Sequence, residues 1–214
     1  MQQFIPQLDK ALKQPLPGLD AQLKLAHGTR KGLYGHPKDA RTAAVLALFF
    51  PKEDDWHLAL IQRAAHEKGH HAGQISFPGG RHEASDPDFR HTALRETEEE
   101  IGVKAIKISI LGDLSSLYIP VSNFLVHPFV GYVDFAPDFQ PEPSEVAQVL
   151  ELPFSEFLAD QAIGKTTLEL PNQMKIKDVP HFNVKNHIIW GATAMMLSEL
   201  VTVAQSIRQY IPSR

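Results

Sequence analysis

Residues 77–102 read FPGGRHEASDPDFRHTALRETEEEIG, which is a glycine pair, a loop, and a helical segment with four glutamates near its end. We expect the helix to span Pro87–Ile101, because Asp86 is a favourable N-cap, proline suits the first helical position, and Gly102 suits the position after the last turn. The C-terminal end of a helix carries partial negative charge, so each acid there costs about 0.3–1 kcal/mol. The glutamates at this end therefore need a physical reason.

Three of these glutamates share one face of the predicted helix. Glu96, Glu99 and Glu100 are related as i, i+3 and i+4, so their carboxylates converge, whereas Glu98 points away. Arg95 lies one turn before Glu99 and can pair with it. Carboxylates so placed repel one another unless a cation lies between them, and Mg²⁺ or Mn²⁺ is a hard ion that prefers such oxygen ligands and reverses the charge at the helix end. The alternative is a solvated acidic helix end, the commoner origin of an isolated charge run.

The composition indicates a soluble, cytoplasmic protein. The chain has 214 residues, enough for one domain with a sizeable core, and a formal net charge of −4 that disfavours a nucleic-acid surface. It contains no cysteine, which excludes disulfides, thiolate metal sites and cysteine nucleophiles. The N-terminus lacks the pattern of a secretory signal, and the longest apolar stretch, at residues 43–50, is too short to cross a membrane.

Short apolar runs alternate with proline-rich loops along the rest of the chain. We expect helices over 4–13 and about 186–210, and strands over 42–50, 57–63, 106–111 and 124–133, with a short strand ending in the glycine pair. Residues 150–158 begin as a strand and turn into a short helix at Pro153, and residues 165–182 form a hairpin around Pro171 and Asn172. Strands and helices mixed without regular βαβ alternation favour an α/β or α+β sandwich over a doubly wound parallel sheet.

The segment RETEEEIGV at Arg95–Val103, preceded by Gly80, resembles the Nudix box, whose usual form is GX5EX7REUXEEXGU with U aliphatic. The chain departs from that form at two points. Its loop is one residue longer, with Asp86 where the first glutamate is expected, and Thr97 occupies an aliphatic position. Helix capping accounts for Asp86, and neither departure touches the acids of the second half.

A longer block, HAGQISFPGGRHE at residues 71–83, is similar to the coenzyme A pyrophosphatase branch of Nudix hydrolases, although the segment at residues 63–74 is slightly longer than in that branch. The resemblance extends over about residues 42–197. It implies a Nudix-type α/β/α sandwich with a mixed β-sheet, an N-terminal helical extension over residues 1–35 and a Nudix hydrolase domain over residues 36–214.

The resemblance also implies roles at the acidic helix. Glu96, Glu99 and Glu100 correspond to the ligands of Mg²⁺ or Mn²⁺, with the Gly80 carbonyl as a further ligand, and Arg95 orients Glu99. Either Glu99 or Glu100 accepts the proton of the attacking water. In some relatives a glutamate from a later loop does so, and Glu145 is the candidate for it here; the alternative is an ordinary loop acid.

Four residues are candidates for substrate contacts. Arg63 and Arg81 flank the glycine pair and can hold phosphate oxygens through their planar guanidinium groups, although surface ion pairs explain them equally well. His71 and Gln74 lie close to the box in sequence and contact either the substrate or the loop, with strand-edge hydrogen bonding as the alternative.

Three functions follow from the resemblance. The first is hydrolysis of coenzyme A or its acyl esters to 3′,5′-ADP and a 4′-phosphopantetheine. The second is the same chemistry on ADP-ribose, a dinucleotide polyphosphate or a nucleoside triphosphate. The third is a binding module without turnover, which the intact acidic cluster argues against. The expected partner is therefore a small nucleotide, with neither nucleic acid nor membrane, and a homodimer is plausible because relatives often pair.

Overall fold

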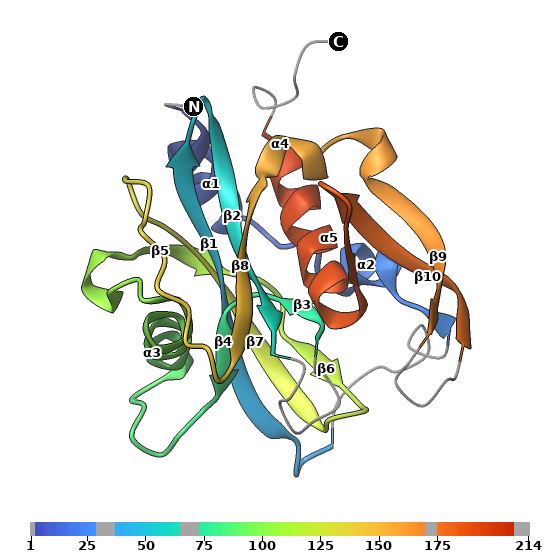
Figure 1. The fold of residues 1–214 in the computed structure, drawn as a ribbon, viewed down its shortest axis with the longest axis horizontal. Helices are drawn as coiled ribbons and strands as arrows, with labels where there is room; N and C mark the ends of the chain where they lie inside the picture. The colour runs from blue at the N-terminus through green and yellow to red at the C-terminus, as the bar shows by residue number, and fades with distance from the viewer. Residues whose placement is uncertain (1–2, 29–36, 65–72, 170–174, 208–214) are drawn as a thin grey trace.

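The computed structural model describes residues 3–28, 37–64, 73–169 and 175–207, and its centre is a mixed eight-stranded sheet (Figure 1). The strand order is β3-β2-β1-β7-β5. Three further strands pair with members of this series: β4 with β1, β8 with β2, and β6 with β7. The pair β1–β7 is parallel and the other pairs are antiparallel, which makes the sheet mixed. The strands are β1 Arg41–Lys52, β2 Asp55–Arg63, β3 Ile75–Ser76, β4 Gly79–Arg81, β5 Ser109–Asp113, β6 Leu117–Ile119, β7 Phe124–Tyr132 and β8 Val146–Pro153.

Strand β1 lies in the middle of the sheet and is buried on both faces. Leu46, Leu48 and Phe50 belong to the apolar core on one face, and Ala47 and Phe49 to the core on the other. This is why its sequence is a nearly continuous apolar run, where a half-exposed strand would show alternation. The strand predicted at residues 42–50 is confirmed.

Helices cover both faces of the sheet. Helix α3 (Phe89–Ile101) packs on one face, whereas α1 (Phe4–Leu12), α2 (Gly18–Gln22), α4 (Phe154–Phe157) and α5 (Gly191–Gln205) lie with a second sheet on the other (Figure 1). The predicted α/β sandwich with a mixed sheet is confirmed. None of the described helices is long and apolar enough to cross a membrane.

The second sheet corrects the predicted start of the last helix. Its order is β11-β10-β9, with bounds β9 Ile163–Glu169, β10 Lys175–Val184 and β11 His187–Trp190. Lys185 and Asn186 both have positive φ, 50° and 64°, which forms the tight turn between β10 and β11. The prediction that the helix begins near Asn186 is therefore wrong, because residues 187–190 pair with β10 before α5 begins. The turn predicted at Pro171 and Asn172 lies outside the described residues.

Helix α3 begins two residues later than predicted. Its N-cap is Asp88, whose carboxylate accepts a hydrogen bond from the His91 N–H at 2.8 Å. Asp86 and Pro87 precede the helix, so the predicted cap is wrong. The predicted end is confirmed, since Gly102 has φ 76° and its N–H donates to the Glu98 carbonyl at 3.0 Å.

Other boundaries differ by a few residues or not at all. Residues 105–107 form a 3₁₀ turn, and β5 begins at Ser109, later than the strand predicted from residue 106. The predicted strand-to-helix change at Pro153 is confirmed by β8 and α4.

Thr97, which stands at the position where the Nudix box usually has an aliphatic residue, is fully buried, and its hydroxyl donates to the Ala93 carbonyl one turn back. This bond satisfies the polar group without a partner outside the helix.

The N-terminal helices pack on the same core as α5. Phe4 of α1 contacts Phe49 and Phe154, with ring centroids 5.5 and 5.6 Å apart. The buried carboxylate of Glu199 in α5 accepts hydrogen bonds from the N–H of Gly18 at 3.0 Å and the side-chain amide of Gln22 at 2.9 Å. Residues 29–36 lie outside the described ranges, so the domain boundary at residue 36 stays a prediction.

Replacing Glu199 by Gln is expected to lower the free energy of unfolding by about 1–3 kcal/mol, because one carboxylate oxygen becomes an NH₂ group that faces N–H donors. Urea unfolding followed by circular dichroism measures the change. Glu169→Gln is the control: Glu169 is exposed on β9 and pairs loosely with Lys175 at 3.6 Å, so its replacement stays within about 0.5 kcal/mol of wild type. Equal effects of the two substitutions would contradict the role assigned to Glu199.

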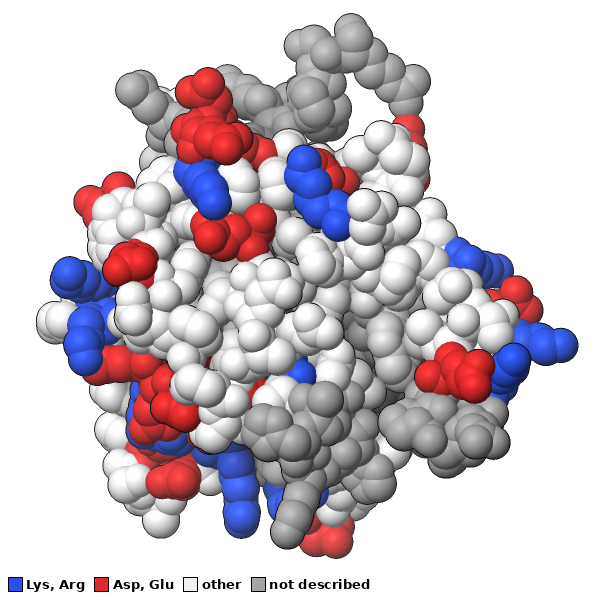
Figure 2. Space-filling model, viewed as in Figure 1, with Lys and Arg blue, Asp and Glu red and all other residues white. Residues whose placement is uncertain are grey.

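Acidic and basic side chains are mixed on the face seen in Figure 2. They are densest around the region of α3, at the left of the view, while much of the centre is uncharged. Among the described residues on this face, no extended basic surface is seen.

Candidate functional site

The glycine pair of β4 lies against the carboxylates of α3. The Gly79 N–H donates to Glu100 Oε2 at 2.7 Å. A Cβ atom at Gly80 would lie 2.4 Å from the carboxylate of Glu96, so only glycine lets this carboxylate approach the strand so closely. Strand β4 is held in place by its antiparallel pairing with β1, where Gly80 lies opposite Ala44. Glu96 and Glu100, one helical turn apart, therefore both face the glycine pair.

Burial and mutual repulsion raise the pKa values of these two acids. Glu100 is 1% exposed, and burial raises its pKa to about 8 against the opposing effects of the Gly79 N–H and Arg63. Burial also raises the pKa of Glu96, against the opposing effect of Arg95. The charge of Glu145 raises the pKa of both acids, so the three carboxylates are close enough to interact. A site of this kind favours either a proton or a cation.

The loop before β8 brings Glu145 to the site. The N–H of Gln140 donates to the Ile101 carbonyl and the N–H of Glu142 to the Glu100 carbonyl, each at 3.0 Å, so the loop satisfies carbonyl groups at the end of α3. The Glu145 carbonyl accepts from the Ala64 N–H at 2.8 Å, which fixes the other side of the loop beside the end of β2.

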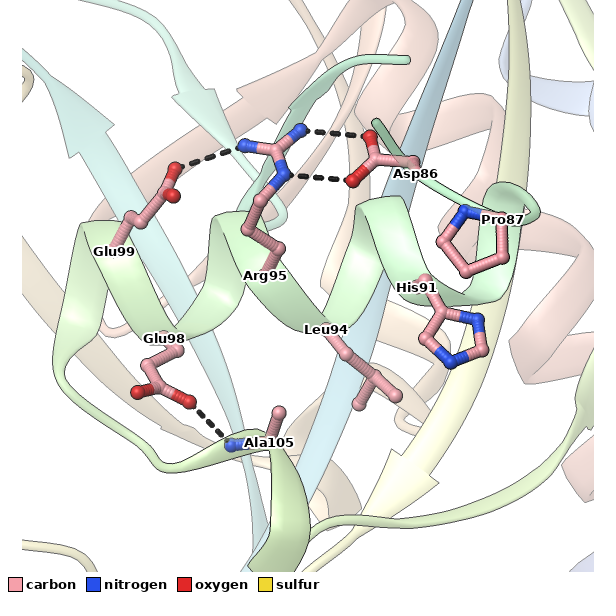
Figure 3. Close-up of a pocket in the computed structure, with 8 residues that line it drawn as sticks. All are labelled: Asp86, Pro87, His91, Leu94, Arg95, Glu98, Glu99 and Ala105. Atoms are coloured by element: carbon pink, nitrogen blue, oxygen red, sulfur yellow. Dashed lines mark hydrogen bonds and ion pairs between the residues drawn. The ribbon is translucent and has the colours of Figure 1, made fainter. Parts of the chain in front are cut away.

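Arg95 uses all of its N–H groups inside the site, and Figure 3 shows its bonds to Asp86 and Glu99. Nε and Nη2 donate to the two carboxylate oxygens of Asp86 at 2.9 and 3.0 Å, and Nη2 also donates to the Arg81 carbonyl at 3.3 Å. Nη1 donates to Glu96 Oε1 and Glu99 Oε2, each at 2.9 Å. A guanidinium group has five N–H donors, so none is left for a substrate phosphate in this arrangement. The predicted pairing of Arg95 with Glu99 is confirmed.

The other predicted site residues take different positions. The side chain of Arg63 donates to Glu100 Oε1 at 3.4 Å, so Arg63 is part of the acidic site. Its backbone N–H donates to the carbonyl of Gln74, just before β3, at 3.0 Å. Arg81 is exposed at the end of β4, and Glu99 has 58% of its side chain exposed. His71 lies outside the described residues.

The predicted metal site is not preformed as a cluster. In the part of the chain that the structure describes, no three His, Cys, Asp or Glu side chains are grouped so that they could hold a metal ion. In this state Arg95 binds both Glu96 and Glu99, and the Gly79 N–H binds Glu100. The chemistry of the donor set nevertheless fits Mg²⁺ or Mn²⁺: the groups are carboxylate oxygens whose repulsion a divalent cation would relieve.

A groove of about 400 Å³ runs along α3 beside these residues (Figure 3). Glu98 on its wall accepts hydrogen bonds from the Ala105 N–H at 2.8 Å and from Lys104 at 2.9 Å, so this glutamate is occupied by local partners and is separate from the acids that face β4. The groove is lined by Asp86, Pro87, His91, Leu94, Arg95, Glu98, Glu99 and Ala105.

The chain matches the model of a known protein family. The model of the NUDIX domain matches residues 40–169, which is more than half of the chain. The chain belongs to the Nudix family. The matched Nudix region begins just before β1 and ends at the last residue of β9, so it contains every candidate site residue, whereas α1, α2 and α5 lie outside it.

Curated relatives also carry the Nudix name. A protein of Photorhabdus laumondii named uncharacterized Nudix hydrolase NudL is 34% identical over 148 residues, which cover 69% of this chain and 77% of the relative. The NudL of Yersinia pestis is 30% identical over 198 residues, covering 92% and 94%. Among solved structures, the Nudix hydrolase RenU of M. smegmatis has a TM-score of 0.49 at 14% identity, covering 82% of this chain and 89% of that one.

Proposed function

We propose that this Nudix protein is a divalent-metal-dependent hydrolase that cleaves the diphosphate bond of coenzyme A or acyl-coenzyme A to 3′,5′-ADP and an (acyl-)4′-phosphopantetheine. The observation that supports hydrolysis best is the pair of carboxylates, Glu96 and Glu100, packed against the Gly79–Gly80 segment with Glu145 close enough to raise their pKa values. A chain without this chemistry would have no reason to keep acids that are unfavourable both at a helix end and in a buried position.

In this proposal Glu96, Glu99 and Glu100 hold Mg²⁺ or Mn²⁺, with the Gly80 carbonyl as a further ligand. Such an ion neutralises charge on the diphosphate oxygens and lowers the pKa of a bound water. The protein contributes the positions of the ligands: Arg95 is bound to both Glu96 and Glu99, and the Gly79 N–H holds Glu100. Arg95 thus orients ligands and leaves phosphate contacts to other residues.

The proton of the attacking water requires a base close to the acids that face β4. Glu100 is one candidate for this role, because the Gly79 N–H holds its carboxylate beside the glycine pair, among the other acids of the site. Glu99 is the alternative on the same helix. Glu145 is the alternative from the loop, supported by its influence on the pKa values of Glu96 and Glu100.

The substrate assignment rests on sequence. The block at residues 71–83 is similar to the coenzyme A pyrophosphatase branch, and part of it, from Gly73 through β3 and β4, borders the acidic site. We assign phosphate contacts to Arg63 and Arg81, and further substrate contacts to His71 and Gln74. Arg63 is 18% exposed beside Glu100, within reach of a group bound at the acids. The matching chemistry on ADP-ribose is the competing assignment.

Incubation with coenzyme A and either Mg²⁺ or Mn²⁺, followed by chromatography, tests the proposal. We expect 3′,5′-ADP and 4′-phosphopantetheine to form in equal amounts, and a chelator to stop the reaction. ADP-ribose and dinucleotide polyphosphates run in parallel, with Glu99→Gln as the variant control. Cleavage of those nucleotides but not of coenzyme A would replace the substrate assignment. Equal turnover by wild type and Glu99→Gln would indicate contamination and favour a non-catalytic module.

A further inference from the structure

We propose that the outer edge of strand β9 is an interface between two copies of this chain, with the two β9 strands paired antiparallel about a two-fold axis at Thr167. The pairing joins the three-stranded sheets of the two copies into one continuous sheet. The inference concerns assembly, and it does not depend on the proposed hydrolysis.

Strand β9 is the outer strand of the second sheet. Among the described strands it pairs only with β10, so no described strand lies along its other side. Figure 1 shows this sheet at the right of the view and α3 at the left, so a second copy on β9 leaves the acidic site uncovered. The edge is seven residues long, and its row of backbone donors and acceptors is a template for another strand.

The pairing with β10 indicates which residues of β9 direct their backbone groups outward. Lys165 lies opposite Pro180, which has no N–H to donate. Proline therefore fits the position of an antiparallel ladder at which the N–H and C=O groups of both residues point away from the partner strand. By the two-residue period of a strand, Thr167 and Glu169 point the same way as Lys165. The outer edge thus offers the backbone groups of these three residues.

The side chains of the same residues are self-complementary in charge. Lys165, Thr167 and Glu169 are exposed, whereas the residues between them are half-buried. An axis at Thr167 places each Lys165 opposite the partner's Glu169, which gives two cross-strand pairs of opposite charge. An axis at Lys165 or at Glu169 would instead place like charges opposite each other. Charge therefore selects one register among those that use the outward backbone groups.

Charged side chains on an edge strand can also serve to prevent pairing. Two features of β9 favour pairing over protection. The strand contains no proline, the other common device for blocking an edge, and Ile163 at its start is 50% exposed. Within the chain, Glu169 forms only a loose pair with Lys175, at 3.6 Å between two exposed side chains, and a pair of this kind contributes little. Glu169 is therefore available to a second copy.

Sedimentation velocity of the wild-type protein between about 1 µM and about 300 µM, without substrate or metal, tests the inference. We expect monomer at the lower concentration and dimer at the higher one, because a single pair of strands is a small interface. Lys165→Glu turns both pairs into like-charge pairs and should weaken the dimer by about 10-fold or more. Adding Glu169→Lys to Lys165→Glu reverses the order of the charges and should restore dimerisation to within about 3-fold of wild type.

Two further variants serve as controls. Lys10 is exposed on α1, so Lys10→Glu makes the same change in net charge away from β9 and should leave dimerisation unchanged. Thr167→Pro removes the N–H group at the proposed axis and should abolish the dimer. An outward position on an edge strand tolerates proline, so circular dichroism and the melting temperature should show a folded monomer.

Three results would overturn the inference. A wild-type protein that stays monomeric over the whole range would mean that the edge charges prevent pairing. A dimer that Lys165→Glu leaves intact would place the interface elsewhere, and a monomeric double variant would exclude the register at Thr167. The charge variants alter only exposed side chains, so these outcomes stand even if Thr167→Pro fails to fold. Only mass is measured, so they are also separate from whether any diphosphate is cleaved.

Discussion

Glu100→Gln is expected to slow hydrolysis by about 10²–10⁴-fold and, at the same time, to make the metal-free protein more stable at alkaline pH. The loss of rate follows from removal of a carboxylate that we propose as a metal ligand and candidate base. The gain in stability follows from burial: Glu100 is 1% exposed, and Gln is a neutral group of the same shape that can still accept the hydrogen bond of the Gly79 N–H.

The sign of the pH dependence comes from the raised pKa. In the unfolded chain Glu100 loses its proton near the ordinary value of 4.5, and in the folded protein near pH 8. Between these values the folded state holds a proton that the unfolded state has released. The contribution of Glu100 to stability therefore falls as pH rises from about 4.5 to about 8, by an amount on the order of 5 kcal/mol, and does not change further above that range. Gln does not titrate, so the variant lacks this fall.

Urea unfolding in the presence of a chelator, at pH 5 and at pH 9, measures the difference between wild type and Glu100→Gln. Glu98→Gln is the control on the same turn of α3. The hydrogen bond from the Ala105 N–H lowers the pKa of Glu98, so its charge stabilises the fold above pH 4.5 and its replacement lowers stability at pH 9. The two variants should thus shift in opposite directions at pH 9. If Glu100→Gln changed the free energy of unfolding equally at both pH values, the conclusion that burial raises the pKa of Glu100 would be wrong.

The helix carrying these acids shows how far local signals reach. Its end was predictable, because Gly102 adopts the positive φ that a stopping glycine allows. Its start was not, because Asp86 and Asp88 are equally good caps by residue type. A tertiary contact decides between them: Asp86 is engaged by Arg95, nine residues away, and Asp88 is left to cap.

Strand β11 escaped prediction for a different reason. His187–Trp190 is four residues long and directly precedes a long apolar helix, so its pattern merges with that of the helix. Only the pairing with β10 and the positive φ values of Lys185 and Asn186 separate the two elements. Pairing partners are set by the sheet as a whole, and a short run does not encode them.

The candidate site divides in the same way. The spacing of Glu96 and Glu100 along a helix placed them on one face, and the structure brings both to the glycine pair. The position of Glu145 could not be predicted in this way. Its loop is held by hydrogen bonds from residues 140 and 142 to the end of α3, and strands β5 to β7 lie between the two segments in the sequence. No local pattern encodes that docking, and the resemblance alone suggested Glu145.

Substitution by alanine is expected to affect a different property at each glycine of β4: stability at Gly79 and Mn²⁺ binding at Gly80. Gly79→Ala should unfold or severely destabilise the protein, by about 4 kcal/mol or more, the upper end of single-substitution effects. Gly79 has φ 147°, and a Cβ atom there would lie 2.3 Å from the Ala44 carbonyl oxygen and 2.5 Å from Val45 Cα. Both atoms belong to the backbone of β1 in the centre of the sheet, so no side-chain rotation relieves the contact.

At Gly80 the Cβ atom would meet only the end of a flexible side chain, the Glu96 carboxylate at 2.4 Å. Glu96 can turn away, so Gly80→Ala should cost about 1 kcal/mol or less in stability. It should weaken Mn²⁺ binding by about 10-fold or more, because the carboxylate that we propose as a ligand is displaced. Melting temperature and Mn²⁺ titration on both variants measure the contrast. A stable Gly79→Ala protein, or a Gly80→Ala protein with wild-type Mn²⁺ affinity, would mean that the glycine pair is a turn rather than the wall of the metal site. Loss of stability at Gly79 and loss of Mn²⁺ affinity at Gly80 would show that the first glycine is required for folding and the second for metal binding.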